Sequence, residues 1–191
     1  MSLRLREDAV DHRHEAHVFL VLEHDHVRPL ALVADRDGPR WQQAFGLQLL
    51  AAQAQHHDLA TKILDDQIEV LRVLPTLVPC ADTTRVGIRG WSFGGYLAAL
   101  AVLRAPDMFH AAVAGAPVTK WDLYDTHYTE RYMGNPHKHA ADYESTSLVA
   151  HAHLLERPLL LIHGLADDNV LAAHTLQFST ALLHHGKVHE L

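Results

Sequence analysis

A serine between two glycines is the first feature of the chain that could do chemistry. Residues 90–94 read GWSFG and fit the pattern G-x-S-x-G. In this pattern the serine stands on a tight, strained turn that lifts its hydroxyl above a sheet as a nucleophile. Gly90 and Gly94 lack side chains because strand and helix would cross there at close range. The pattern favours acyl transfer through Ser92, and the alternative is a glycine-rich turn with a solvent-facing serine.

The elements around this serine must be a strand and a helix if the motif is to work. Arg85–Arg89 predicts a short strand before it, and Gly94–Arg104 predicts a mostly apolar helix after it, which stops before Pro106. The start of such a helix directs its dipole and free N–H groups at the place where negative charge develops. We therefore expect the Phe93 N–H to be the first oxyanion donor.

An acid should follow a later strand, since the chain order of such sites is Ser, Asp, His. Leu159–Ile162 predicts an apolar strand, and Asp167 and Asp168 come after its carboxyl end, where open α/β sheets place their sites. Either carboxylate could instead be a solvated or helix-capping residue. We expect Asp168 to cap a helix that begins near Val170, which leaves Asp167 to orient a histidine.

The remaining elements from Thr61 onward alternate between helix and strand. One helix is predicted by apolar residues on a single face and should end at Pro75; those residues are Leu64, Ile68, Leu71 and Leu74. Further elements are a strand at Ala111–Ala116, a helix at Val170–His184 ended by Gly186, and a strand at Lys187–Leu191. The alternation indicates an α/β fold with a mostly parallel sheet and helices on both faces.

Composition narrows the classes of function. The 191 residues carry 16 Lys+Arg against 23 Asp+Glu, a net charge of −7, which argues against binding a phosphate backbone. A single cysteine, Cys80, excludes an intrachain disulfide and a cysteine-rich zinc site. The apolar runs are too short to span a bilayer, and the charged N-terminus is not a secretory signal. We therefore expect no nucleic acid, no membrane segment and a cytoplasmic location.

Three stretches together resemble the prolyl oligopeptidase family of serine peptidases, and within it the dipeptidyl-peptidase-IV-like catalytic domains. They are RVGIRGWSFGGY at 85–96, APVTKWDLYDTHYTERYMG at 116–134 and LLLIHGLADDNV at 159–170. The resemblance covers about residues 61–191 and implies a partial α/β-hydrolase fold. It implies Ser92 as the nucleophile, Asp167 as the triad acid, and cleavage of the peptide bond after proline or alanine.

The resemblance also implies a pocket for the proline-like ring that precedes the scissile bond. Its lining would be Tyr124, Tyr128, Trp121, Val118 and Val170, and Asn169 would contact the substrate carbonyl before that ring. Aromatic walls suit a compact apolar ring because they select it by shape and burial. Tyr124 and Tyr128 are four residues apart, so on a helix they would share a face. The alternative is a pair of core tyrosines.

The chain departs from the family pattern at two points. None of its 18 histidines occupies the family's triad position, because the chain stops within the strand that precedes it. His163, His184, His185 and His189 are not expected to take over the role. Residues 1–60 contain no tyrosine, whereas the family's second oxyanion donor is one, and the family's β-propeller is absent. A serine without a general base is a weak nucleophile at neutral pH.

Residues 1–60 are expected to be an N-terminal segment without a family match, and residues 61–191 a truncated peptidase domain. Val18–Leu22 and Val27–Val33 could be strands, and Trp41–Gln55 predicts a helix. This segment also contains a group of histidines, which are His12, His14, His17, His24 and His26. These side chains could bind a metal ion or could lie on a solvated surface, and we favour the solvated surface. A third hypothesis is that this segment is translated from a shifted reading frame.

The sequence therefore predicts a serine-type peptidase that is impaired in this chain. No cofactor and no metal are implied, the partner is a peptide substrate, and a homodimer through the hydrolase domain is possible within the family. The alternatives are a non-catalytic remnant or binding module, favoured by the absent histidine, and another acyl hydrolase such as an acylaminoacyl peptidase or an esterase. Residues 121–134 argue against the last of these.

Overall fold

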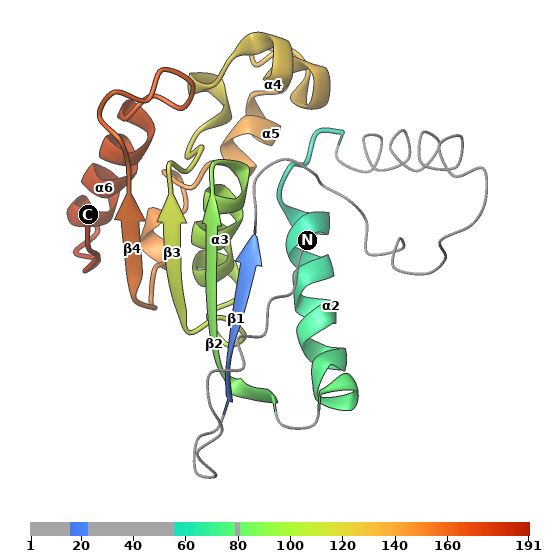
Figure 1. The fold of residues 1–191 in the computed structure, drawn as a ribbon. Coiled ribbons are helices and arrows are strands. Elements are labelled where there is room, and N and C mark those ends of the chain that lie inside the picture. Colours follow the sequence, from blue (N-terminus) through green and yellow to red (C-terminus); the bar gives the residue numbers. More distant parts are fainter. Residues whose placement is uncertain (1–15, 23–55, 79–80) are drawn as a thin grey trace.

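The centre of the fold is a parallel sheet. The computed structural model describes residues 16–22, 56–78 and 81–191. Four strands follow one another across the sheet in the order of the chain, and each neighbouring pair is parallel (Figure 1). They are β1 (Ala16–Leu22), β2 (Ala81–Trp91), β3 (Ala111–Gly115) and β4 (Leu159–Ile162). The strands predicted around residues 18, 85, 111 and 159 are thus confirmed.

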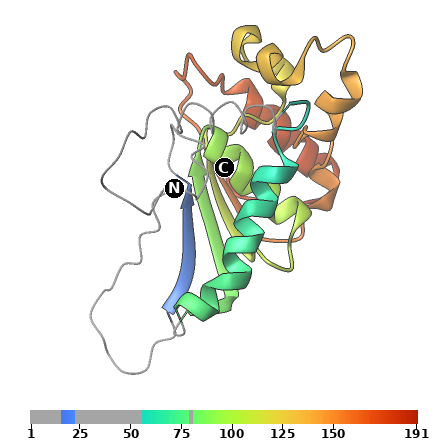
Figure 2. The same ribbon diagram turned by 90° about the vertical axis from the view of Figure 1, so that its right-hand side faces the viewer.

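Helices make the crossovers that parallel strands require. The α-helices are α2 (Thr61–Leu77), α3 (Phe93–Arg104), α4 (Thr126–Met133), α5 (Ala140–Ser145) and α6 (Ala173–His184), with short 3₁₀ turns η2 (Trp121–Leu123) and η3 (Ala152–Leu154). Figure 2 shows α2, α3 and α6 on the same side of the sheet. We expected helices on both faces. Crossovers are right-handed, so a sheet that grows in one direction puts successive helices on one face.

The core lies between the sheet and α3. Nearly every side chain of α3 is buried, and the helix packs between β2, β3 and α2. Ile88 of β2 and Leu161 of β4 meet this layer from the sheet, and Phe178 meets it from α6. A helix that is apolar on all sides is stable only in such a position. This burial fixes the start of α3, and therefore Ser92, against the sheet.

Several element ends differ from those that the sequence predicted. α2 continues through Pro75 to Leu77 although the proline removes a backbone donor, and beyond it the Val78 N–H donates to the Leu74 carbonyl (2.8 Å). α6 begins at Ala173 and not near Val170. The predicted strand at Lys187–Leu191 is reduced to a single parallel bridge between Leu160 and Glu190. The predicted elements Val27–Val33 and Trp41–Gln55 lie outside the described residues. Over the described residues, no helix is long and apolar enough to cross a membrane.

Candidate active site

Ser92 occupies a strained turn between β2 and α3. Its φ is 56° and its ψ is −117°, a backbone conformation that residues other than glycine rarely adopt. The Ser92 N–H donates to the Gly115 carbonyl of β3 (2.8 Å), and the Ser92 carbonyl accepts from the Tyr96 N–H (2.9 Å). The turn is therefore held from both the sheet and the helix. This is the geometry that the G-x-S-x-G pattern predicted.

The glycines of the motif permit a close backbone approach. A Cβ at Gly90 would lie well under 3.0 Å from the carbonyl of Gly94, and a Cβ at Gly95 would lie equally close to the carbonyl of Gly115. Both neighbours are backbone atoms, which cannot move aside without shifting a strand or a helix. The sequence argument for Gly90 is thus confirmed, and Gly95 makes a second close crossing with β3.

The start of α3 is arranged for an anion beside Ser92. Phe93 is the first residue of the helix, so its N–H belongs to the donors that a helix leaves without an intrahelical partner. The positive end of the helix dipole lies at the same place. An oxyanion formed next to the Ser92 hydroxyl would meet this donor first.

A small aromatic pocket opens beside the serine. It has a volume of about 70 Å³ and is lined by Ser92, Phe93, Val118, Trp121, Tyr124 and Tyr128. The Trp121 ring stacks on that of Tyr128, with centroids 6.1 Å apart and planes 20° apart. The Tyr124 ring meets both edge-on, at 6.2 Å from Trp121 and 5.7 Å from Tyr128. The structure thus brings together six of the residues that the sequence analysis singled out.

Local structure places these rings differently from the prediction. Tyr124 precedes α4, so the two tyrosines do not share a helix face; they meet because the chain turns between them. The Asp125 side chain caps α4 by accepting from the Tyr128 N–H (2.9 Å), which fixes the start of the helix that carries Tyr128. Burial raises the pKa of Tyr128 to about 12, with Tyr132, Tyr124 and Asp125 adding to the shift. Its phenol therefore stays neutral in any ordinary buffer.

The loop after β4 carries both carboxylates, and their roles differ from the expectation. Asp167 Oδ1 accepts from the N–H groups of Asn169 and Val170, each at 3.0 Å. Asp168 does not cap a helix there, because Asp167 holds the turn and α6 begins five residues after Asp168. The other carboxylate oxygen, Asp167 Oδ2, faces His163 and lies 3.8 Å from His163 Nε2.

The two remaining predicted residues, Asn169 and Val170, do not line the pocket. Asn169 Oδ1 accepts from the Tyr124 hydroxyl (3.2 Å), which ties the acid loop to the pocket wall. Val170 is buried in the core. Sequence reasoning missed a second tie, between Thr119 and His174. The Thr119 N–H donates to His174 Nδ1 (3.1 Å), and its hydroxyl donates to the His174 carbonyl (2.8 Å). No motif in the sequence marks this pair.

The histidines near the acid loop are already engaged. His163 Nε2–H donates to the Val170 carbonyl (2.7 Å) and its Nδ1 accepts from the Thr175 hydroxyl (2.6 Å), since a carbonyl can only accept. His189 is held likewise by the Lys187 carbonyl and the Ser179 hydroxyl. Burial lowers the pKa of His174 to about 4, with His163 nearby adding to the shift. None of these three rings is placed as a free base.

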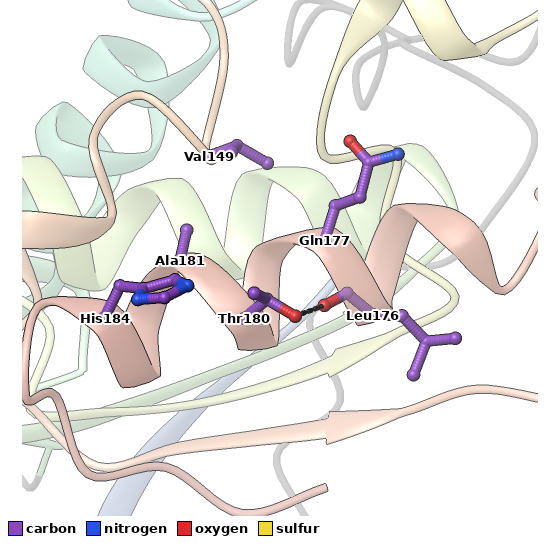
Figure 3. Close-up of a pocket in the computed structure, with 6 residues that line it drawn as sticks. All are labelled: Val149, Leu176, Gln177, Thr180, Ala181 and His184. Carbon is purple, nitrogen blue, oxygen red and sulfur yellow. Dashed lines mark hydrogen bonds between the residues drawn. The ribbon is translucent and has the colours of Figure 1, made fainter.

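A larger hollow lies elsewhere on the molecule. It has a volume of about 380 Å³ and runs along α6; Figure 3 shows its lining, which is Val149, Leu176, Gln177, Thr180, Ala181 and His184. The Thr180 hydroxyl in it donates to the Leu176 carbonyl of the same helix (2.8 Å). This hollow includes neither Ser92 nor Asp167. The small aromatic pocket is therefore the candidate active site.

Comparisons with known proteins show the family to which the chain belongs. The model of the prolyl oligopeptidase family matches residues 51–191. Dipeptidyl peptidase 8 of Mus musculus is 44% identical over 131 residues, and Dipeptidyl peptidase 4 of Bos taurus is 38% identical over 131 residues. Each match covers 67% of this chain, but 15% and 17% of the respective relative. The crystal structure of Porphyromonas gingivalis dipeptidyl peptidase 4 matches with a TM-score of 0.62 and 38% identity, over 66% of this chain and 18% of that one.

Proposed function

The chain belongs to the prolyl oligopeptidase family of serine peptidases, and we propose that its site cleaves a peptide bond after proline or alanine through an acyl-enzyme on Ser92. The relatives are dipeptidyl peptidases, so it is a dipeptidyl-peptidase-like member of that family. It spans less than a fifth of the length of those relatives. The observation that carries the proposal is the strained Ser92 at the mouth of an aromatic pocket.

The residues would divide the work as follows. Ser92 Oγ attacks the carbonyl carbon and gives its proton to a histidine, while the Phe93 N–H stabilises the oxyanion. The histidine then protonates the leaving amine, and water attacks the acyl-enzyme by the reverse route to release the acid and restore Ser92. Asp167 Oδ2 would orient that histidine, since Oδ1 is occupied by two backbone N–H groups.

The proposal needs a histidine as its base, and the three histidine rings described above are not placed for that role. His163, His174 and His189 are bound or buried as set out above. We infer that the base is the histidine that the family pattern places in a segment beyond residue 191. On this inference the 191-residue chain by itself is a weak catalyst, with at most the ~10³–10⁴-fold advantage over water that sites retain without a triad.

Specificity would come from the pocket. A proline ring is compact and apolar and has no N–H, so flat aromatic walls recognise it by contact. The rings of Trp121, Tyr124 and Tyr128 provide such walls at the serine. Asn169 lies beside Tyr124 and would contact the preceding substrate carbonyl. A homodimer, a cytoplasmic location and the division of the chain at residue 60 stay predictions.

A labelling experiment tests the proposal. The 191-residue chain and a chain extended through the family's histidine segment are each treated with a fluorophosphonate probe and with a Xaa-Pro chromogenic dipeptide. We expect Ser92-dependent labelling and turnover in the extended chain, and no measurable turnover in the shorter one. Ser92→Ala is the control in both. Robust Ser92-dependent turnover by the shorter chain would show that one of its own histidines is the base, and an unlabelled, folded extended chain would favour a non-catalytic binding module.

A further inference from the structure

Two histidines and an aspartate converge away from the active-site pocket. His57 Nδ1 lies 3.0 Å from Asp142 Oδ2, and His139 Nδ1 lies 3.4 Å from the same oxygen. The two imidazole rings face each other with centroids 4.1 Å apart. His57 comes from the turn before α2, whereas His139 and Asp142 come from the start of α5. Their distance along the chain explains why no spacing in the sequence indicates the cluster.

The three ligand atoms lie close enough together to share one ion. The three ligand atoms lie within 4.8 Å of one another. Two ligands of a tetrahedral zinc ion, each about 2.0–2.1 Å from the metal, are separated by roughly 3.3–3.5 Å. His57 Nδ1 is buried and makes no hydrogen bond of acceptable geometry, in spite of its short distance to Asp142. His57 Nδ1 therefore points into the cluster without a hydrogen-bond partner of good geometry.

The backbone holds His57 in place for this arrangement. The residue has a φ of 65°, which is rare for a side chain of this size, and its N–H donates to the Tyr132 carbonyl at the end of α4 (2.8 Å). Gly134 packs directly beneath the rings, since a Cβ there would meet both His139 and His57. The cluster is thus built from two segments, and the end of α4 packs against both.

We propose that His57, His139 and Asp142 bind a zinc ion or a divalent transition metal of the same class, with the remaining position taken by water. Two imidazoles and a carboxylate are ligands that zinc commonly takes in proteins. The ion would join the turn before α2 to α5 and to the end of α4. It would be structural for the site, because the Tyr132 ring packs 5.1 Å from that of Tyr128, which lines the pocket.

Metal titration of the full chain tests the proposal. After treatment with EDTA, zinc is titrated in competition with a chromophoric chelator, and Tm is followed in parallel. We expect zinc to raise Tm, because an ion that binds only the folded state stabilises it. Asp142→Asn should weaken this zinc binding at least tenfold while keeping a hydrogen-bonding side chain, and His57→Ala combined with His139→Ala should abolish the rise in Tm.

A matched control separates this site from the other histidines. His137 is exposed and lies two residues before His139, so His137→Ala should bind zinc as the unaltered chain does. Cobalt should give the visible bands of a four-coordinate site in the unaltered chain and in His137→Ala only. If the Tm rise persists in the double variant, or if zinc does not raise Tm in a chain whose circular dichroism shows it folded, the proposal is wrong.

Discussion

At the scale of single residues, the backbone of Ser92 carries a cost that its chemistry explains. Its φ of 56° places a side chain in a region that disfavours a Cβ, and such positions cost of order 1–3 kcal/mol. The hydrogen bond to Gly115 and the burial of α3 keep the residue there. The free energy of unfolding of the chain is therefore lower than it would be with a relaxed turn.

Replacing Ser92 separates this strain from the hydroxyl. Ser92→Gly removes the Cβ and should be more stable than Ser92→Ala by about 1 kcal/mol, which is the strain relieved less the extra entropy of glycine in the unfolded state. Ser92→Ala keeps the Cβ and the strain. The measurement is urea denaturation of both variants, and equal midpoints would show that the turn is not strained.

The two carboxylates after β4 are distinguished by their bonds. Asp167 Oδ1 accepts two backbone N–H groups and its Oδ2 lies 3.8 Å from His163 Nε2, whereas no bond from Asp168 supports the loop in the described structure. In the chain extended through the histidine segment, Asp167→Asn should lower kcat on the order of 10⁴-fold by favouring the wrong imidazole tautomer. Asp168→Asn should leave kcat nearly unchanged. The reverse ranking would reassign the acid.

The aromatic walls predict a change in substrate preference. In the same extended chain, Tyr128→Ala or Tyr124→Ala should reduce kcat/KM for Xaa-Pro more than for Xaa-Ala, because a ring loses more contact area than a methyl group. A difference of a few methylenes is worth ~1–3 kcal/mol, or about 10–200-fold. The ratio of the two kcat/KM values cancels any loss of folded enzyme, and an unchanged ratio in both variants would make these tyrosines core residues.

Residue types and spacing could predict the strained turn at Ser92, because G-x-S-x-G has a local signature, whereas the pocket residues followed only from the resemblance to the family. Residue types and spacing could not assign the loop bonds correctly. Asp167 and Asp168 are equivalent in sequence, and only the direction of the chain after β4 decides which one accepts the N–H groups of Asn169 and Val170. Tyr124 and Tyr128 meet through a turn that their spacing does not encode.

At the scale of elements, the starts of α2, α3 and α4 are each fixed by a side chain or by the sheet. α4 is capped by Asp125, and α3 begins at the Ser92 turn. Before α2, Asp58 Oδ1 accepts from the N–H groups of Ala60 (2.9 Å) and Thr61 (2.8 Å). Burial of Asp58 opposes its ionisation, but the hydrogen bonds from Thr61 and Ala60 and the charge of Arg104 outweigh it and lower the Asp58 pKa.

Removing the Asp58 carboxylate tests its role at α2. Asp58→Ala should lower the free energy of unfolding by ~0.5–2 kcal/mol at pH 7, the usual range for a lost cap. Asp65→Ala, on the exposed middle of the same helix, is the control and should have little effect. Because the Asp58 pKa is lowered on folding, the difference between the chain and Asp58→Ala should shrink as pH falls below 3.8. A difference that stays constant down to pH 2 would contradict this account.

The spacing of apolar residues predicted most helices and strands from residue 61 onward, but it did not predict where they end. α6 starts later than its apolar pattern because the Asp167 turn occupies the preceding residues. The face of the sheet that the helices cover follows from the strand order, and alternation alone does not give that order.

At the scale of the whole molecule, the core contains a histidine that burial keeps neutral. His174 is fully buried at the start of α6, beside Thr119 and the segment that leads to Trp121. Its pKa is lowered from 6.5 to about 4 by burial, with His163 adding to the shift. Between these two pH values the unfolded chain binds a proton that the folded chain does not. The free energy of unfolding therefore falls as pH falls from 6.5 to 4.

Acid unfolding should reveal this group. The contribution of His174 to the free energy of unfolding, measured by urea denaturation, should be constant above pH 6.5. It should fall by up to ~3 kcal/mol as the pH is lowered to 4. In His174→Gln that part of the decline should vanish, so that the two curves converge at low pH. His184→Gln, on the exposed face of α6, should keep the full decline. Parallel curves for the chain and His174→Gln would exclude His174 as the cause.

The order of the strands has a consequence for the way in which the chain acquires its active site. Each strand joins the edge of a sheet made from residues that precede it, so the sheet can grow as synthesis proceeds. The Ser92 turn, however, closes only when Gly115 has left the ribosome, because that residue accepts its N–H. Asp167 arrives later still, after β4. The nucleophile and the acid are thus positioned at different times during synthesis. A nascent chain that ended before β4 could have formed the Ser92 turn but would lack Asp167.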